Sequence, residues 1–239
     1  QCDCPILFYD KMQVVGPSGI NIERFDEKMK LEQNRRLVTY YSLLTQMRVN
    51  GGNDYINLVN SILSGKCNQQ ACLENYDFKV MSDFNRFNNL QQKLEDEFTL
   101  SRMIAGYAWE WKSKKDKSLY DMELDGVKKQ WNYRLENWVL SEGADKQVGC
   151  IHTIQGFDLN YGFVIMGNEI GYDPESKEII VRPENYYDEN GRKTASKEEL
   201  LEYIKHIYYV LMTRGIKGTY LYICDDNLRK YVSSIIGVI

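Results

Sequence analysis

Two segments in the second half of the chain place polar side chains directly beside apolar runs. The first, at residues 148–158, reads VGCIHTIQGFD, and the second, at residues 209–217, reads YVLMTRGIK. Open α/β folds place ligand-handling residues in this way, because buried strands and helices end in loops that can hold the chemistry. Arg214 follows the apolar run of the second segment, and a guanidinium group offers a fork of permanently charged donors to phosphate or carboxylate.

A segment that could bind the phosphates of a nucleotide alone is missing from the sequence. Such a loop needs glycines whose backbone N–H groups approach phosphate, followed by Lys and by Ser or Thr. Gly65-Lys66-Cys67 is the nearest approach, but it lacks the preceding glycine and the hydroxyl that would hold Mg²⁺. We therefore expect this chain by itself not to hydrolyse ATP.

The composition is that of an ordered globular protein. The chain has 239 residues, of which 43% are hydrophobic and 27% charged, so it can bury a sizeable core. That length suits one large domain, or one domain with part of another. The formal net charge of −4 argues against a surface coated for the nucleic-acid backbone, although it leaves room for a local basic groove.

The six cysteines and two histidines show no metal-ligand pattern. Neither Cys2 and Cys4 nor Cys67 and Cys72 have the spacing of a zinc knuckle, so we expect no metal and reduced thiols in a cytoplasmic protein. No apolar run reaches the roughly 20 residues that span a bilayer, and no signal peptide is visible, so we expect no membrane contact. The absence of an initiating Met leads us to expect a fragment of a longer protein.

The elements that must position these residues follow an α/β order. Residues 5–9 and 37–41 are short apolar runs typical of buried parallel strands, and a charged helical stretch to about residue 36 separates them. A helix with one apolar face is expected after Gly51 and Gly52, ending at Gly65.

The middle of the chain has the pattern of strand, helix and strand. Residues 78–81 and 102–109 have strand composition, and Asp83 can cap the helix between them. This order favours a right-handed parallel crossover.

Two insertions interrupt the order. Residues 112–140 are charged, with a hairpin signal at residues 125–126 and two tryptophans, Trp131 and Trp138, that we expect to be exposed. Residues 170–192 are a polar excursion punctuated by Asp, Asn and Gly, which is typical of a second hairpin.

The last part returns to the α/β pattern. Residues 162–166 and 218–224 are strand candidates, and between them Ser196 and Glu199 form a capping box that opens the clearest helix of the chain. The apolar face expected for this helix consists of Leu200, Ile204, Ile207 and Leu211.

Four segments, in this order, resemble the third to sixth motifs of a superfamily-one helicase motor. They are Asp10-x-x-Gln13, residues 43–48 (LLTQMR), residues 151–158 (IHTIQGFD) and residues 210–214 (VLMTR). Residues 101–111 (SRMIAGYAWEW) also resemble a signature of the Schlafen-type DNA/RNA helicase domain, a group of uncharacterised bacterial proteins. The resemblance extends over most of the chain, and four ordered segments are more specific than any one alone.

The resemblance implies a fold and a set of partners. The chain would be the C-terminal part of a helicase-like P-loop NTPase, with residues 1–36 as the closing edge of the first motor domain. Residues 37–239 would form a RecA-like second domain, an α/β fold with a mainly parallel sheet flanked by helices. The full-length protein would bind ATP and Mg²⁺ and act on DNA or RNA, and a missing N-terminal motor domain would supply the phosphate loop.

The resemblance also implies residue roles. The residues that would contact the nucleotide are Gln13, Arg48, Gln155, Gly156 and Arg214. Those that would contact the nucleic acid are His152 and Thr153. Arg48 and Arg214 would reach the γ-phosphate and Gln13 would sense it. The acidic pair expected for Mg²⁺ is absent, and Asp158 stands where many such motors carry Glu.

Each assignment has a structural alternative. Arg214 could interact with the C-terminal dipole of its helix, and Arg48 could form a surface ion pair. His152 could be a satisfied buried histidine, and Gln13 or Gln155 could satisfy buried backbone groups.

Alternatives also remain for the aromatic pair and for the whole chain. Trp109 and Trp111, two residues apart, would share a strand face and favour a core or interface role over base stacking. The chain could be a non-catalytic regulatory or binding module on a motor-derived scaffold. A nuclease using Asp3, Asp10 and Mg²⁺ is disfavoured, because no carboxylate cluster has convincing spacing.

Overall fold

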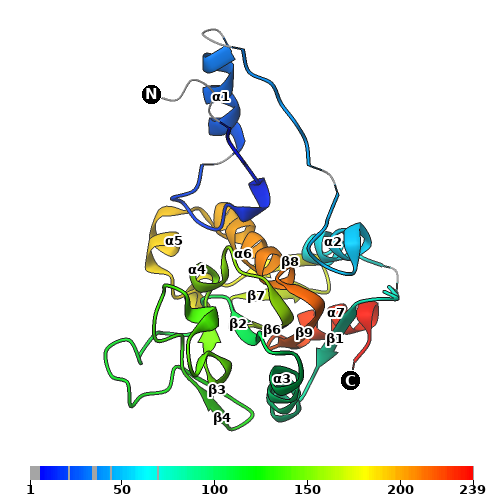
Figure 1. Ribbon diagram of the computed structural model, residues 1–239, viewed down its shortest axis with the longest axis vertical. Helices are drawn as coiled ribbons and strands as arrows, with labels where there is room; N and C mark the ends of the chain where they lie inside the picture. The colour runs from blue at the N-terminus through cyan, green and yellow to red at the C-terminus, as the bar shows by residue number, and fades with distance from the viewer. Residues whose placement is uncertain (1–5, 21, 34–36, 44, 69, 239) are drawn as a thin grey trace.

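A five-stranded parallel sheet forms the centre of the molecule (Figure 1). The computed structural model describes residues 6–20, 22–33, 37–43, 45–68 and 70–238. The strands run in the order β1-β9-β6-β2-β5, and every adjacent pair is parallel. Their bounds are β1 Asp77–Met81, β2 Ser101–Ala105, β5 Val148–Gly149, β6 Leu159–Met166 and β9 Gly215–Ile223. The predicted α/β class with a mainly parallel sheet is confirmed.

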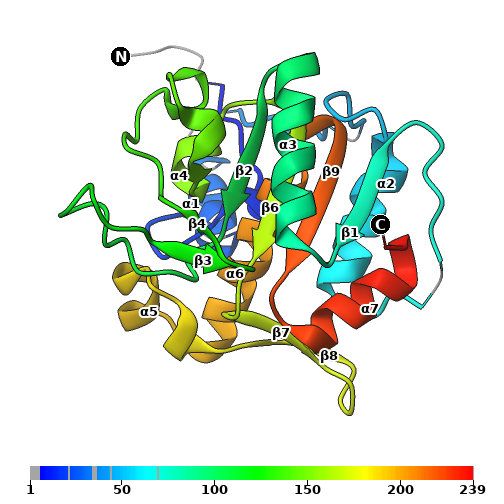
Figure 2. The ribbon, with the colours of Figure 1, turned by 90° about the horizontal axis from the view of Figure 1, so that it is seen from below.

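Helices cover both faces of the sheet (Figure 2). One face packs against α3 (Phe84–Phe98), and the other packs against α2 (Gly52–Leu63), α6 (Lys197–Met212) and α7 (Asp226–Ile236). Alternate residues of a strand point to opposite faces, so Leu221 and Ile223 of β9 join the α6 side while Tyr220 and Tyr222 join the α3 side.

The helix starts follow the predicted capping chemistry. The Asp83 carboxylate accepts a hydrogen bond from the Arg86 N–H at 3.0 Å. The Ser196 hydroxyl accepts from the Glu199 N–H at 3.1 Å, and the Glu199 carboxylate accepts from the Ser196 N–H at 2.8 Å, so the capping box is confirmed. The predicted apolar face of α6 is buried at all four positions, Leu200, Ile204, Ile207 and Leu211.

The first insertion contains the predicted hairpin, formed by β3 (Met122–Leu124) and β4 (Val127–Lys129). Asp125 at its tip has a left-handed φ of 48° and docks on the start of α3. Its carboxylate accepts from the Phe84 N–H at 2.8 Å and from the Tyr222 hydroxyl at 3.2 Å, and its carbonyl accepts from the Asn85 amide at 3.1 Å. The hairpin is therefore fastened to the main sheet.

The prediction that Trp131 and Trp138 are exposed is wrong. Their exposed fractions are 1% and 0%, and each indole N–H has a hydrogen-bond partner in a segment that flanks the insertion. Trp138 Nε1 donates to Gln147 Oε1 at 3.0 Å, and Trp131 Nε1 donates to the Trp109 carbonyl at 3.3 Å. Trp138 and Trp131 therefore join the two main cores of the domain, one on each side of the sheet, which the charged composition of the insertion conceals.

Short elements connect the insertions to the sheet. They are the 3-10 helices η2 (Trp138–Leu140), η3 (Ala144–Lys146) and η4 (Pro183–Asn185) and the α-helices α4 (Ile151–Ile154) and α5 (Glu189–Thr194). The second insertion begins with the predicted hairpin, β7 (Ile170–Asp173) and β8 (Glu178–Val181). Strand β2 ends at Ala105, so Trp109 and Trp111 lie in irregular backbone and do not share a strand face as predicted.

The N-terminal part stands away from the sheet (Figure 1). It contains the 3-10 helix η1 (Lys11–Gln13) and α1 (Ile22–Gln33). Residues 6–9 and 37–41 are not strands, so both predictions are wrong where these residues are described, and residue 5 lies outside the described residues. Apolar composition alone does not make a strand, which needs a neighbouring strand to satisfy its backbone, and the described sheet offers these segments none.

Candidate functional site

Arg214 lies between the end of α6 and the start of β9, and its exposed fraction is only 3%. The guanidinium group donates to backbone carbonyls, from Nε to Val210 at 3.2 Å and from Nη1 to Phe157 at 3.5 Å. No carboxylate among the described residues forms an ion pair with it. Burial, and then the nearby charge of Arg48, lower the pKa of Arg214 to about 10.

A buried hydrogen-bond network holds the backbone on both sides of Arg214. The Tyr55 hydroxyl donates to the Met212 carbonyl at 2.7 Å, and the Tyr76 hydroxyl donates to the Gly215 carbonyl at 2.9 Å. Thr219 completes the network, since its hydroxyl lies 3.0 Å from the Met212 carbonyl and 2.8 Å from the Tyr76 hydroxyl. Sequence reasoning missed this support, because its members lie far apart in the chain and each is a common core residue.

Arg48 reaches the same place from a separate loop. Val49 beside it is buried, and the Asn50 N–H donates to the Ile216 carbonyl of β9 at 2.9 Å, so the loop is fixed to the strand that follows Arg214. The Arg48 Nε forms an ion pair with Asp158 Oδ1 at 2.7 Å. The two side chains are 36% and 46% exposed, so this pair is open to solvent.

The turn at residues 155–158 connects the two arginines. Arg214 donates to the carbonyl of Phe157, and Arg48 pairs with the next residue, Asp158. Gly156 in this turn has a φ of 86°, a conformation that favours glycine, and Gln155 ends α4. Residues predicted from three separate motifs therefore meet at the amino ends of β6 and β9.

The Gln13 segment packs onto α6 close to this turn. The Gln13 side-chain amide donates to Asp10 Oδ2 at 3.0 Å, and His206 Nδ1 donates to the Val14 carbonyl at 2.9 Å. Asp10 lies near enough to Tyr209 that its charge, after burial, raises the pKa of that phenol. The structure thus brings Gln13, Arg48 and Arg214 to one region.

His152 and Thr153 differ in their surroundings. His152 is exposed on α4, with its ring centroid 5.9 Å from that of Tyr107. Thr153 is 1% exposed, and its hydroxyl donates to the Cys150 carbonyl at 2.8 Å. In this arrangement His152 faces solvent, and the Thr153 hydroxyl stabilises the helix turn.

The described residues offer no group of three or more His, Cys, Asp or Glu side chains arranged for a metal ion. Cys72, Cys150 and Cys224 are free thiols, and Cys2 and Cys4 lie outside the described part. No helix in the described ranges is long and apolar enough to cross a membrane.

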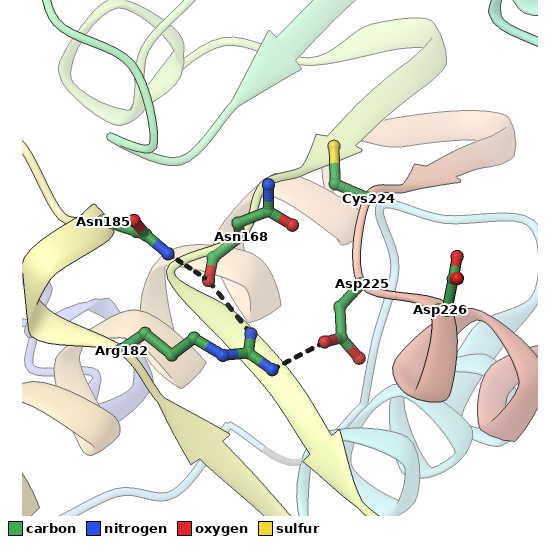
Figure 3. Close-up of a pocket in the computed structure, with 6 residues that line it drawn as sticks. All are labelled: Asn168, Arg182, Asn185, Cys224, Asp225 and Asp226. Atoms are coloured by element: carbon green, nitrogen blue, oxygen red, sulfur yellow. Dashed lines mark hydrogen bonds and ion pairs between the residues drawn. The ribbon is translucent and has the colours of Figure 1, made fainter.

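A second polar region lies at the opposite, carboxyl ends of β6 and β9 (Figure 3). A pocket of about 430 Å³ is lined by Asn168, Arg182, Asn185, Cys224, Asp225 and Asp226. Arg182 forms an ion pair with Asp225 at 2.7 Å and donates to the Asn168 carbonyl at 3.1 Å. Much of the polarity of this pocket is therefore used within the protein.

Next to this region Glu169 is completely buried. It accepts a short hydrogen bond from the Tyr208 hydroxyl, while its Oε2 has no hydrogen-bond partner in the described structure. Burial raises the pKa of the carboxyl group to about 7. The sequence carried no signal for this residue, which lies just before the second insertion, between the exposed Asn168 and the buried Ile170.

Comparison with known proteins supports the resemblance to the Schlafen-type family. Residues 1–225 match the family model described as Schlafen group 3, DNA/RNA helicase domain. An uncharacterised protein of Saccharomyces cerevisiae is 31% identical over 262 residues, which cover 96% of this chain and 56% of that protein. The chain thus spans little more than half the length of this yeast relative, whereas the sequence resemblance pointed to bacterial proteins. The chain belongs to the Schlafen group 3 DNA/RNA helicase domain family.

Proposed function

We propose that this domain supplies the arginine side of a composite nucleotide site in a nucleic-acid-dependent ATPase. Arg214 and Arg48 contact the γ-phosphate of ATP held by a separate motor lobe, and Gln13 senses that phosphate. In this proposal residues 37–239 are a RecA-like second helicase domain, and residues 1–36 belong to the edge of the first. The observation that carries the proposal is that Arg48 and Arg214 both bind the turn at residues 155–158, at Asp158 and at the Phe157 carbonyl.

The charge balance of the site supports an anionic ligand. Desolvation disfavours the buried Arg214 cation, its bonds go only to carbonyls, and a second guanidinium lies nearby. An incoming phosphate would offset both costs, and positioned arginines stabilise the charge that develops during phosphoryl transfer. Arg48 must leave Asp158 to take part, and an exposed pair of this kind costs only about 0–1 kcal/mol to break.

The turn at residues 155–158 is suited to couple nucleotide and nucleic acid. Gln155 and Gly156 lie between the arginine contacts and α4, which carries the exposed His152. A shift of this turn on phosphate binding would move α4. The exposed His152 is proposed as the nucleic-acid contact on this helix, and the buried Thr153, which bonds the Cys150 carbonyl, as a residue that holds the helix turn. The missing motor lobe would hold ATP and Mg²⁺, because no glycine-rich phosphate loop is present in this sequence.

The test is the nucleic-acid-stimulated ATPase of the longer parent protein. Arg214→Ala should lower turnover by about 10³-fold or more, as loss of an arginine that reaches the γ-phosphate does, and Arg214→Lys should restore only part of it. Arg192→Ala, which removes an exposed guanidinium on α5, is the matched control and should leave turnover unchanged. Unaltered turnover in Arg214→Ala would refute the assigned role.

The second candidate is a non-catalytic regulatory or binding module on the same scaffold. It is favoured by the Arg48–Asp158 pair and by the backbone contacts of Arg214, which satisfy both arginines without nucleotide. A parent protein that binds nucleic acid but shows no ATPase activity at any nucleic-acid concentration would select this alternative.

A further inference from the structure

The first insertion carries an exposed basic loop at residues 112–120 (KSKKDKSLY), here called the lysine loop. All four of its lysines are exposed, in a chain whose formal net charge is −4. Asp116 is the single acid within the loop. Positive charge is therefore concentrated locally on a protein that is acidic as a whole.

The lysine loop is held in a defined shape. The buried Asp121 carboxylate closes its base, accepting from the Ser113 N–H at 2.8 Å and from the Trp131 N–H at 2.7 Å. The Gln130 side-chain amide donates to the Lys117 and Leu119 carbonyls at 2.8 and 2.6 Å. A preformed loop loses less conformational entropy when it binds a ligand.

Most of the positive charge of the loop is not neutralised by the described residues. None of its lysines forms an ion pair with a described carboxylate. Asp116 is exposed and accepts from the Ser118 N–H at 2.9 Å and from its hydroxyl at 2.7 Å. These bonds lower its pKa, so it stays charged and offsets one of the four positive charges of the loop. The ammonium groups are thus available to an external anion.

Exposed aromatic rings accompany the lysines. Tyr120 is 53% exposed and Tyr133 is 50% exposed, and the Lys117 ammonium lies 4.6 Å from the Tyr133 ring centroid. Lysines beside exposed aromatic rings are the combination that binds single-stranded nucleic acids, through phosphate charge and base stacking. A purely electrostatic contact with an acidic peptide would not need the rings.

The base of the loop also lies close to His152. The Tyr107 ring is 5.9 Å from His152 on one side and 6.1 Å from Trp131 on the other. Figure 1 shows the first insertion beside α4. The proposed nucleic-acid residue and the lysine loop can therefore contact one continuous strand.

We propose that the lysine loop and Tyr120 form a second contact for single-stranded nucleic acid, extending the track that starts at His152. This proposal rests on the proposed function for the placement of the strand at α4. It assigns binding to a part of the insertion outside the four helicase-like segments.

The test is the affinity of this 239-residue chain for a fluorescent oligothymidylate or oligouridylate of about 20 nucleotides across a range of salt concentrations. The loop variant replaces Lys112, Lys114, Lys115 and Lys117 with Gln. Each phosphate contact contributes about 0.7 to the slope of log affinity against log salt on single strands, so the slope should fall by about 3. At 0.1 M salt the affinity should fall on the order of 10²-fold.

The control variant makes the same charge change elsewhere, at Lys66, Lys79, Lys177 and Lys230, which are all exposed and lie outside the first insertion. It should retain most of the affinity, and circular dichroism of both variants checks folding. Tyr120→Leu should weaken binding of the oligonucleotide but not of an abasic strand of equal length, because only the former can stack.

Three results would overturn the proposal: equal losses in loop and control variants, equal binding of the loop variant and the unaltered chain, or no binding by the unaltered chain. If polyglutamate displaced the bound fluorescent oligonucleotide as well as an unlabelled oligonucleotide does, the loop would be assigned to an acidic protein partner. That result would also overturn the proposal. The proposed function is judged separately, since the ATPase of Arg214→Ala does not depend on the lysine loop.

Discussion

Replacement of Glu169 by Gln should remove a distinct pH dependence of stability. Burial raises the pKa of this carboxyl from the ordinary value of 4.5 to about 7 in the folded chain. The folded state therefore holds the proton more tightly than the unfolded state. The resulting stabilisation is fully present below pH 4.5 and is lost as the pH rises to about 7. A difference of about 2.5 pKa units corresponds to about 3 kcal/mol at 1.36 kcal/mol per unit.

The assay is chemical denaturation of the Glu169→Gln variant and the unaltered chain at pH 4.5 and pH 8. Gln keeps the acceptor for the Tyr208 hydroxyl but cannot ionise. From pH 4.5 to pH 8 the unaltered chain should lose about 3 kcal/mol of unfolding free energy relative to the variant, because only the unaltered chain has a carboxyl group to ionise at this position. Glu175→Gln, at an exposed position in the β7–β8 hairpin, controls for loss of a surface charge. Parallel pH profiles for Glu169→Gln and the unaltered chain would show that the carboxyl group is not buried as described.

Two further predictions concern the arginine site. Tyr76→Phe removes the hydroxyl that bonds the Gly215 carbonyl and should lower the free energy of unfolding by about 1–2 kcal/mol. The control is Tyr120→Phe, at an exposed ring, which should change it by less than about 0.5 kcal/mol in the same denaturation assay. Asp158→Asn frees Arg48 from its ion pair and removes a negative charge beside the proposed phosphate position. ATP titrations of the parent protein should therefore show severalfold tighter binding, and the free energy of unfolding should change by less than about 1 kcal/mol, because the pair is exposed. Weaker ATP binding by Asp158→Asn would contradict the view that Asp158 competes with phosphate for Arg48.

Local sequence patterns predicted the parts of the fold that local chemistry determines. The caps at Asp83 and Ser196 and the turn at Asp125 each use side-chain or backbone preferences within a few residues, and the structure confirms them. The runs at residues 6–9 and 37–41 failed because a strand depends on a partner that composition does not reveal.

The arginine site was predictable in its charged members but not in its support. Arg48 and Arg214 are indicated by the order of the helicase-like motifs. Tyr55 and Tyr76 are not, because the residues that they bond, Met212 and Gly215, lie 157 and 139 positions further along the chain. Trp138 was misjudged for a related reason. Its partner Gln147 lies beyond an irregular stretch, where no periodicity indicates burial.

The Asp125 turn bears on where this fold can admit a ligand. In open α/β sheets, ligands usually enter beyond the carboxyl ends of the strands, where anions also find the first N–H groups of a helix. Here a carboxylate from the protein's own hairpin takes the Phe84 N–H and the Tyr222 hydroxyl at that edge. An external phosphate would have to displace this internal anion first, which favours the proposed placement of the triphosphate at the opposite edge of the sheet, beside Arg48 and Arg214.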